Sequence, residues 1–226
     1  MTPGAFWRQV GWVFAKDLQV EVRGGVTLRM ATPFAALALL LAPLAIGTDT
    51  ALLRRIGPGM LWLVVILFGM TVTLRSGAPE SGPVRDLLTL SGLDPAAAFL
   101  GRSLASAVLL FGVTLVLAPL MVVLYAPEGS PGWGWLALLA IAGVMALGLL
   151  GSLVATLVTG LRERTALGPL MAIPLAVPVL LATARGTDSA ISQQGSLSWL
   201  LLLVAMNLAL VIVGVLLAGP MDESTR

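Results

Sequence analysis

Six long apolar segments, separated by short polar stretches, dominate the chain from residue 30 onward. A membrane-spanning helix needs roughly 20 apolar residues, with a range of about 17 to 25. The pattern therefore predicts six membrane-spanning helices, and with no internal repeat they form a single transmembrane domain over residues 1–226. The predicted spans are about 30–47, 58–74, 96–125, 133–161, 166–184 and 197–218.

Residues 6–23 precede the first span and have the periodicity of an amphipathic helix. At about 100° per residue, one face is apolar and basic and amide side chains cover the other. We predict a basic helix that lies flat on an anionic leaflet. Asp17 and Glu21 break the pattern, because they lie one turn apart on the apolar side. Either they pair with nearby arginines of the same chain, or they face a cytoplasmic partner or the polar stretch between spans two and three.

That polar stretch, Arg75–Arg102, has the pattern of a short helix rather than of a plain loop. Gly82-Pro83 is a helix start, and leucines then fall on one side with polar side chains on the other. Gly92 is a natural stop, and Asp94-Pro95 forms a cap and the first residue of the next helix. Two interpretations stay open: a handle through which a soluble motor moves the membrane helices, or an interfacial loop helix on the headgroups.

The composition supports an integral membrane protein and limits its chemistry. Hydrophobic residues make up 58% of the chain and charged residues 11%, with a mean hydropathy of +1.00, whereas soluble domains carry about 25% charged residues. Cysteine and histidine are absent, which excludes disulfides, thiol chemistry and histidine-ligated zinc or haem within this chain. No GxxxxGK[ST] run is present, so the chain has no such phosphate-binding loop.

The distribution of Lys and Arg predicts the orientation of the chain. With a cytoplasmic N-terminus, only three of the 13 basic residues fall on the outer side, namely Arg54, Arg55 and Arg185. This bias places both termini and the stretch 75–102 in the cytoplasm. Trp133 and Trp135 enter the fourth span from outside, at the depth of an aromatic belt. Four outer residues are therefore candidates for contact with a partner: Arg54, Arg55, Trp133 and Trp135.

The spans contain no ionisable side chain at depth, which argues against a proton- or ion-coupled carrier and against an intramembrane acid–base enzyme. Asn207 is the most polar group of the last span, and we expect it to form an interhelical hydrogen bond. Pro169, Pro174 and Pro178 predict a kinked or broken fifth span that packs against other helices. We favour a static kink there over a flexible gate.

Several short runs together resemble one family. Ile56–Trp62 (Ile-Gly-Pro-Gly-Met-Leu-Trp) opens the second span, Lys16-Asp17-Leu18 lies in the first helix, and Pro43–Gly47 ends the first span. Pro174–Leu181 adds a proline-rich run, and Glu80-Ser81-Gly82 precedes a leucine pair and a serine. These runs, over almost the whole chain, resemble the cytochrome c maturation protein B family, also called haem exporter protein B. One acidic position of the family's acidic-acidic-glycine element is serine here.

The resemblance implies an all-α integral membrane protein with an ABC-2-like permease fold. Its expected parts are an N-terminal amphipathic elbow helix, six spans and a cytoplasmic coupling helix between spans two and three. The family's chains are noncatalytic permease subunits, so ATP and Mg are expected on a cytoplasmic ABC ATPase subunit and haem on partner subunits. The other implied partners are a haem-handling membrane protein, a small membrane subunit and a periplasmic haem chaperone, in the bacterial inner membrane.

Within this family, ATP-driven motion promotes release of the haem-loaded chaperone. We expect the helix Pro83–Leu93 to receive that motion, and Asp17 and Glu21 to contribute a cytoplasmic contact of the elbow helix. The predicted ATPase-coupling residues are Glu80, Pro83, Val84, Arg85, Asp86, Leu87, Leu88, Leu90 and Ser91. Two alternatives are an ABC-2 exporter that carries its own lipid or drug between two copies, and a passive membrane scaffold.

The orientation generates a direct test. Site-specific labelling of residues 83–93 with a membrane-impermeant reagent should succeed from the cytoplasmic side only, because the positive-inside bias places this stretch there. Labelling from the periplasmic side of intact cells would contradict both the orientation and the coupling role.

Overall fold

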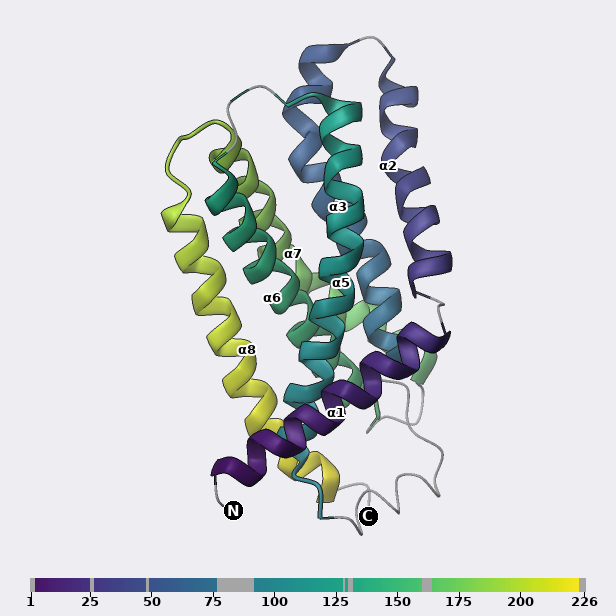
Figure 1. The fold of residues 1–226 in the computed structure, drawn as a ribbon, viewed down its shortest axis with the longest axis vertical. Coiled ribbons are helices and arrows are strands. Elements are labelled where there is room, and N and C mark those ends of the chain that lie inside the picture. The colour runs from purple at the N-terminus through teal and green to yellow at the C-terminus, as the bar shows by residue number, and fades with distance from the viewer. Residues whose placement is uncertain are drawn as a thin grey trace.

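The computed structural model is all-helical over the residues that it describes, which are 3–24, 27–47, 49–76, 92–127, 129, 132–159 and 164–223. A short π-helix, η1 (Thr27–Ala31), leads into the second of the seven α-helices found in the described residues. These are α1 (Pro3–Gly24), α2 (Thr32–Ile46), α3 (Thr50–Ser76), α5 (Pro95–Tyr125), α6 (Trp133–Thr159), α7 (Arg164–Ile191) and α8 (Leu197–Glu223). Figure 1 shows α2, α3 and α5–α8 as an upright bundle, with α1 lying obliquely across the end where both termini are found.

Five helices in the described part of the chain are long and apolar enough to cross a membrane, so the chain is a multi-pass membrane protein. The predicted first, third and sixth spans agree closely with Arg29–Ile46, Pro95–Tyr125 and Leu197–Ala218. The predicted count of six spans stays a prediction, because the side chains in the first part of α7 lie outside the described residues.

The helix that contains the second span begins before residue 58, and the predicted membrane boundary at that residue stays a prediction. Helix α3 begins at Thr50, and Pro58 lies inside it. The Asp49 carboxylate caps this start by accepting from the Leu52 N–H at 3.0 Å, as a short acidic side chain does ahead of a helix. Pro58 removes one backbone hydrogen bond and does not end the helix. Arg54 and Arg55 therefore lie on the first turns of α3 and not in a loop.

Of the two forms predicted for the fifth span, kinked or broken, the break is excluded and the favoured static kink stays a prediction. Helix α7 is continuous from Arg164 to Ile191 and includes all three prolines, Pro169, Pro174 and Pro178. It also extends past the predicted end at residue 184, because its last turns pack inside the bundle. A Cβ added at Gly186 would lie 2.8 Å from Leu139 Cδ2 of α6. Packing against neighbouring helices offsets the loss of individual proline hydrogen bonds.

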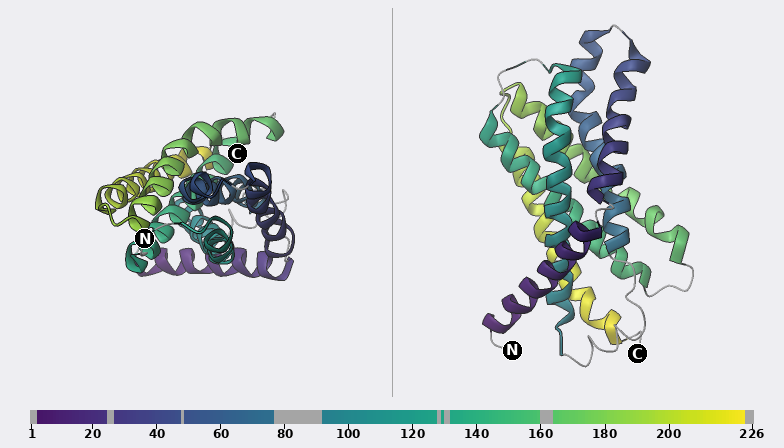
Figure 2. Two further views of the ribbon diagram at one scale, coloured as in Figure 1. Left: turned by 90° about the horizontal axis from the view of Figure 1, so that it is seen from above. Right: turned by 45° about the vertical axis from the view of Figure 1, so that its right-hand side comes forward.

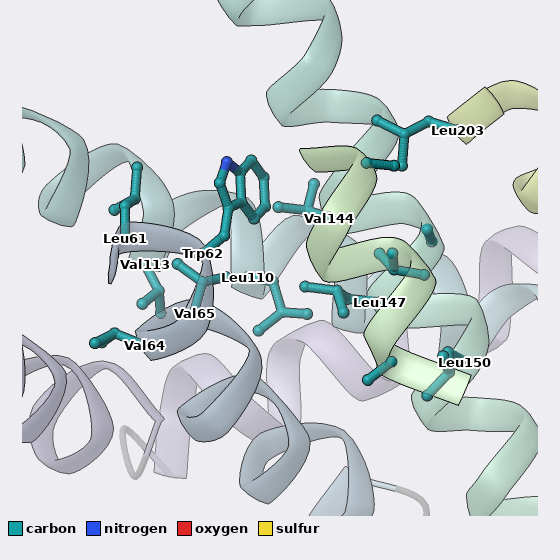
Figure 3. Close-up of a cluster of buried hydrophobic side chains, with 14 of the residues drawn as sticks. Leu61, Trp62, Val64, Val65, Leu110, Val113, Val144, Leu147, Leu150 and Leu203 are labelled. Atoms are coloured by element: carbon teal, nitrogen blue, oxygen red, sulfur yellow. The ribbon is translucent and has the colours of Figure 1, made fainter. Parts of the chain in front are cut away.

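The core lies where α3, α5, α6 and α8 meet. Figure 3 shows Trp62 and Val65 of α3 beside Leu110 of α5, with Val144 and Leu147 of α6 facing them. Trp62 is fully buried, and its Nε1–H donates to Thr187 Oγ1 of α7 at 2.8 Å. This bond gives the single polar atom of the indole a partner. The core therefore joins α3 to α7 as well as filling the centre of the bundle.

Small residues bring helices close together, as the spacing of Gly148 and Ser152 in the fourth span predicts. A Cβ added at Gly148 would lie 2.6 Å from the carbonyl oxygen of Ser103 and 3.1 Å from Ala107 Cβ, both on α5. Ser152 and Ser103 are buried in the same region of α5 and α6. Close backbone approach at small residues is a main source of helix association in membranes.

Two side chains bond to backbone carbonyls of neighbouring spans. Asn207 Nδ2 donates to Ala142 O of α6 at 2.9 Å, which confirms the interhelical bond expected of Asn207. Tyr125 Oη–H donates to Leu39 O of α2 at 2.8 Å, and both residues are buried. The carbonyl of Leu39 is the one that Pro43, four residues later, leaves without its helical N–H donor. Tyr125 thus satisfies a polar group that the hydrocarbon core cannot.

The Tyr125 bond makes a prediction about stability. Tyr125→Phe should lower the free energy of unfolding by about 1–3 kcal/mol, because it leaves the buried Leu39 carbonyl without a partner. Pro43→Ala restores a backbone N–H to that carbonyl, so Tyr125→Phe should cost much less in that background. Thermal unfolding in detergent, followed by circular dichroism, is measured for the wild type, for each single variant and for the double variant. Equal effects of Tyr125→Phe in both backgrounds would contradict this account.

Candidate functional site

The predicted coupling segment enters and leaves the described structure at the α1 end of the bundle. Helix α3 ends at Ser76 there, and the described chain resumes at Gly92 just before α5 (Figure 1). The nine predicted coupling residues lie outside the described residues: Glu80, Pro83, Val84, Arg85, Asp86, Leu87, Leu88, Leu90 and Ser91. What the structure places is the exit of this segment and the surface beside it.

The exit has the conformation that its sequence predicts. Gly92 has a φ of +68°, the left-handed conformation typical of a helix stop. Asp94 is the N-cap of α5, and its Oδ1 accepts from the Ala96 N–H at 2.9 Å. Pro95 occupies the first helical position, where a missing N–H costs nothing. The predicted helix start at Asp94-Pro95 is therefore confirmed, and the stop at Gly92 stays a prediction because residues 77–91 lie outside the described residues.

Helix α1 packs across the beginning of α5. Val10 and Val13 are buried, and they lie against Gly101 of α5. A Cβ at position 101 would lie 2.7 Å from Val13 Cβ and 2.9 Å from Val10 O, so only glycine allows this approach. Beside this contact, the half-buried side chain of Gln9 hydrogen-bonds to the backbone of Gly92 and Asp94. The sequence pattern places Gln9 on the polar side of the helix but does not indicate this partner.

The remainder of α1 presents aromatic and basic side chains outward. Trp7 and Trp12 are each more than half exposed, and the Arg8 guanidinium lies 5.4 Å from the centre of the Trp12 ring. A shallow depression of about 390 Å³ runs along this side. Its lining residues are Trp12, Ala15, Lys16, Gln19, Val20 and Arg23. Exposed tryptophans next to cations are typical of a helix at a membrane surface.

Asp17 and Glu21 lie on the side of α1 that faces the bundle, and both are partly buried. Asp17 Oδ1 pairs with Lys16 Nζ at 3.2 Å. Among the described residues, the ion pair of Asp17 is therefore with the adjacent lysine, and the expected pairing of Asp17 and Glu21 with arginines stays a prediction. Asp17 Oδ2 is buried and has no hydrogen-bond partner among the described residues. A cytoplasmic contact of Asp17 and Glu21 stays a prediction.

The four predicted partner-facing residues lie at the opposite end of the bundle from α1. Arg54 and Arg55 are exposed on the first turns of α3. Trp133 and Trp135 are on the first turn of α6, and 75% and 39% of their surfaces are exposed. Figure 2 shows that α3 and α6 begin at this end, away from α1. The structure brings these residues to one end, and their contact with a partner stays a prediction.

Among the residues that the structure describes, no group of three or more acidic side chains gathers as metal ligands do. The described part of the site therefore offers packing surfaces, backbone hydrogen bonds and cationic side chains. These features suit mechanical contact between helices or contact with a membrane surface.

Comparison with known proteins gives one consistent match. The model of the CcmB protein family matches residues 8–220. Three similar relatives are each named "Heme exporter protein B". The Rhodobacter capsulatus protein is 33% identical over 76% of this chain and 79% of its own length. The Paracoccus denitrificans protein is 30% identical over 86% and 89%, and the Pseudomonas aeruginosa protein is 28% identical over 88% and 90%.

The family resemblance that the short sequence runs indicate is thus confirmed over nearly the whole chain. The chain belongs to the CcmB family, as a noncatalytic membrane permease of the heme exporter protein B type.

Proposed function

We propose that this chain is the permease subunit of an ABC complex for haem export and cytochrome c maturation. It passes ATP-driven motion from a cytoplasmic ATPase to a haem-handling membrane partner and promotes release of a haem-loaded periplasmic chaperone. The observation that carries the proposal is the family match over residues 8–220. A small membrane subunit completes the set of partners, and ATP, Mg and haem are held by those partners.

The arrangement of the helices supports a mechanical role. The segment 77–91 connects α3 to α5, and α5 packs against α1, α2, α3, α6 and α8. A displacement applied to this segment therefore acts directly on α3 and α5, each of which packs against several other helices. Packed helices respond to such a load by small sliding movements rather than by continuous deformation.

The two ends of the bundle suit different partners. The α1 end carries both termini and the end of α3 and the start of α5, between which the segment 77–91 runs in the sequence. In the proposed orientation this end faces the cytoplasm of a bacterial inner membrane and the ATPase. The opposite end exposes Arg54, Arg55, Trp133 and Trp135, and we assign it to the haem-handling protein or the periplasmic chaperone. Motion then passes from one end of the helices to the other.

The proposal is tested by copurification from detergent. The wild-type chain should retain an ATPase together with haem-handling membrane proteins. An ATPase with only a second copy of this chain would favour an ABC-2 exporter of a lipid or drug. Recovery of the chain alone would favour a passive scaffold. Either of these two outcomes would overturn the proposed function.

Leu87→Asp with Leu88→Asp should weaken ATPase binding by roughly 30-fold or more, because two leucines that we propose to pack against the ATPase become charged. Membrane insertion should stay intact, since the change lies outside the predicted spans. Thr89→Asp, on the predicted polar side of the same segment, is the matched control and should leave the ATPase bound. Binding and cytochrome c maturation at wild-type levels in the double variant would count against the coupling role of this segment.

A further inference from the structure

The Gln9 carboxamide joins α1 to the chain that leads out of the segment 77–91. Its Nε2 donates to Gly92 O at 3.3 Å, and its Oε1 accepts from the Asp94 N–H at 3.1 Å. The two backbone groups flank Leu93 and point to the same side, as they do across an extended residue in a strand pair. One planar amide therefore holds two backbone positions that lie more than 80 residues away in the sequence.

The chain that Gln9 holds leads directly into a capped helix. The Asp94 side chain bonds to the Ala96 N–H at 2.9 Å, and Pro95 restricts its own φ angle. Gly92, which has a φ of +68°, is the conformationally free position before them. With both Gln9 bonds in place, Gly92 O and Asp94 N are fixed on either side of Leu93. Without them, Gly92 and Leu93 are the natural place for the chain to bend.

The contacts around Gln9 form a closed set. Val10 and Val13 lie near Gln9 on α1 and pack on Gly101 of α5. A Cβ added at Gly101 would lie only 2.7 Å from Val13 Cβ. Gln9 bonds to residues 92 and 94, and residue 94 caps the same helix α5. Three elements are therefore each in contact with the other two, namely α1, residues 92–94 and the first turns of α5. Loss of the Gln9 side chain removes the hydrogen bonds that join α1 to residues 92 and 94.

We propose that Gln9 is a positioning residue that locks the exit of the segment 77–91 to α1 and α5. When this segment is displaced, α1 and α5 then move together with it. The displacement is not lost in a bend of the chain at Gly92. The inference rests on the proposed function, in which the segment receives force from an ATPase. It adds a role for α1 beyond membrane association, namely as a brace on the force-receiving segment.

The absence of cysteine allows the lock to be measured directly, because spin labels can be placed at two new cysteines alone. Ala15→Cys marks an exposed site on α1 and Ser91→Cys marks the residue before the exit. Double electron–electron resonance on the purified complex gives the distance distribution between them. Gln9→Leu should broaden it, and Gln9→Glu should broaden it less, because one acceptor toward the Asp94 N–H remains. An unchanged distribution in Gln9→Leu would overturn the lock.

A functional readout separates bracing from general stability. In the assembled complex, Gln9→Leu should keep the ATPase bound and ATP hydrolysis within about twofold, while mature c-type cytochrome formed per ATP falls about fivefold or more. Gln19→Leu changes the same residue type at an exposed position of α1 and should leave that ratio unchanged.

An unchanged ratio in Gln9→Leu contradicts the inference. Absence of an ATPase from the wild-type complex contradicts the proposed function instead, and the spin-label distances still decide on the lock.

Discussion

Close approach of helices to α5 is the constraint on which the rest of the structure depends. In a bilayer, lipid tails are as apolar as leucine, so helices associate through van der Waals packing and small residues. Along α5 the close contacts occur where one of the two helices carries glycine, and an added Cβ would meet atoms of the other at less than 3 Å. These glycines are Gly101 beneath α1, Gly57 and Gly69 of α3, Gly148 of α6 and Gly214 of α8. Helix α5 therefore packs against these neighbouring helices without polar groups at most of the contacts.

The helices themselves were largely predictable from hydropathy, because each long apolar segment has few alternatives to a membrane helix. The helix boundaries that differ from the predicted spans lie where local signals compete with capping or tertiary packing. Pro58 suggests a helix start, yet the Asp49 cap begins α3 earlier. Three prolines predict a kinked or broken fifth span, yet α7 continues through them, and contacts around Gly186 and Thr187 keep its last turns inside the bundle. The Asp49 cap is a local contact that the pattern could have indicated, whereas the contacts at the end of α7 join residues far apart in the sequence.

The candidate site shows the same division. Gly92 and Asp94-Pro95 were predictable, because a left-handed stop and a capped proline start depend on neighbouring residues alone. The partner of Gln9 was not, because a glutamine on the polar side of an amphipathic helix has the same local pattern whether it meets water or a distant backbone. Asp17 stood out as an acid on an apolar face, but the pattern does not reveal that Lys16 is its partner.

The described side-chain hydrogen bonds between bundle helices join three separate pairs. Tyr125 ties α5 to α2, Trp62 ties α3 to α7, and Asn207 ties α8 to α6. Separation within a pair exposes a carbonyl, an indole N–H or an amide to hydrocarbon. These three bonds therefore oppose the separation of α5 from α2, of α3 from α7 and of α8 from α6.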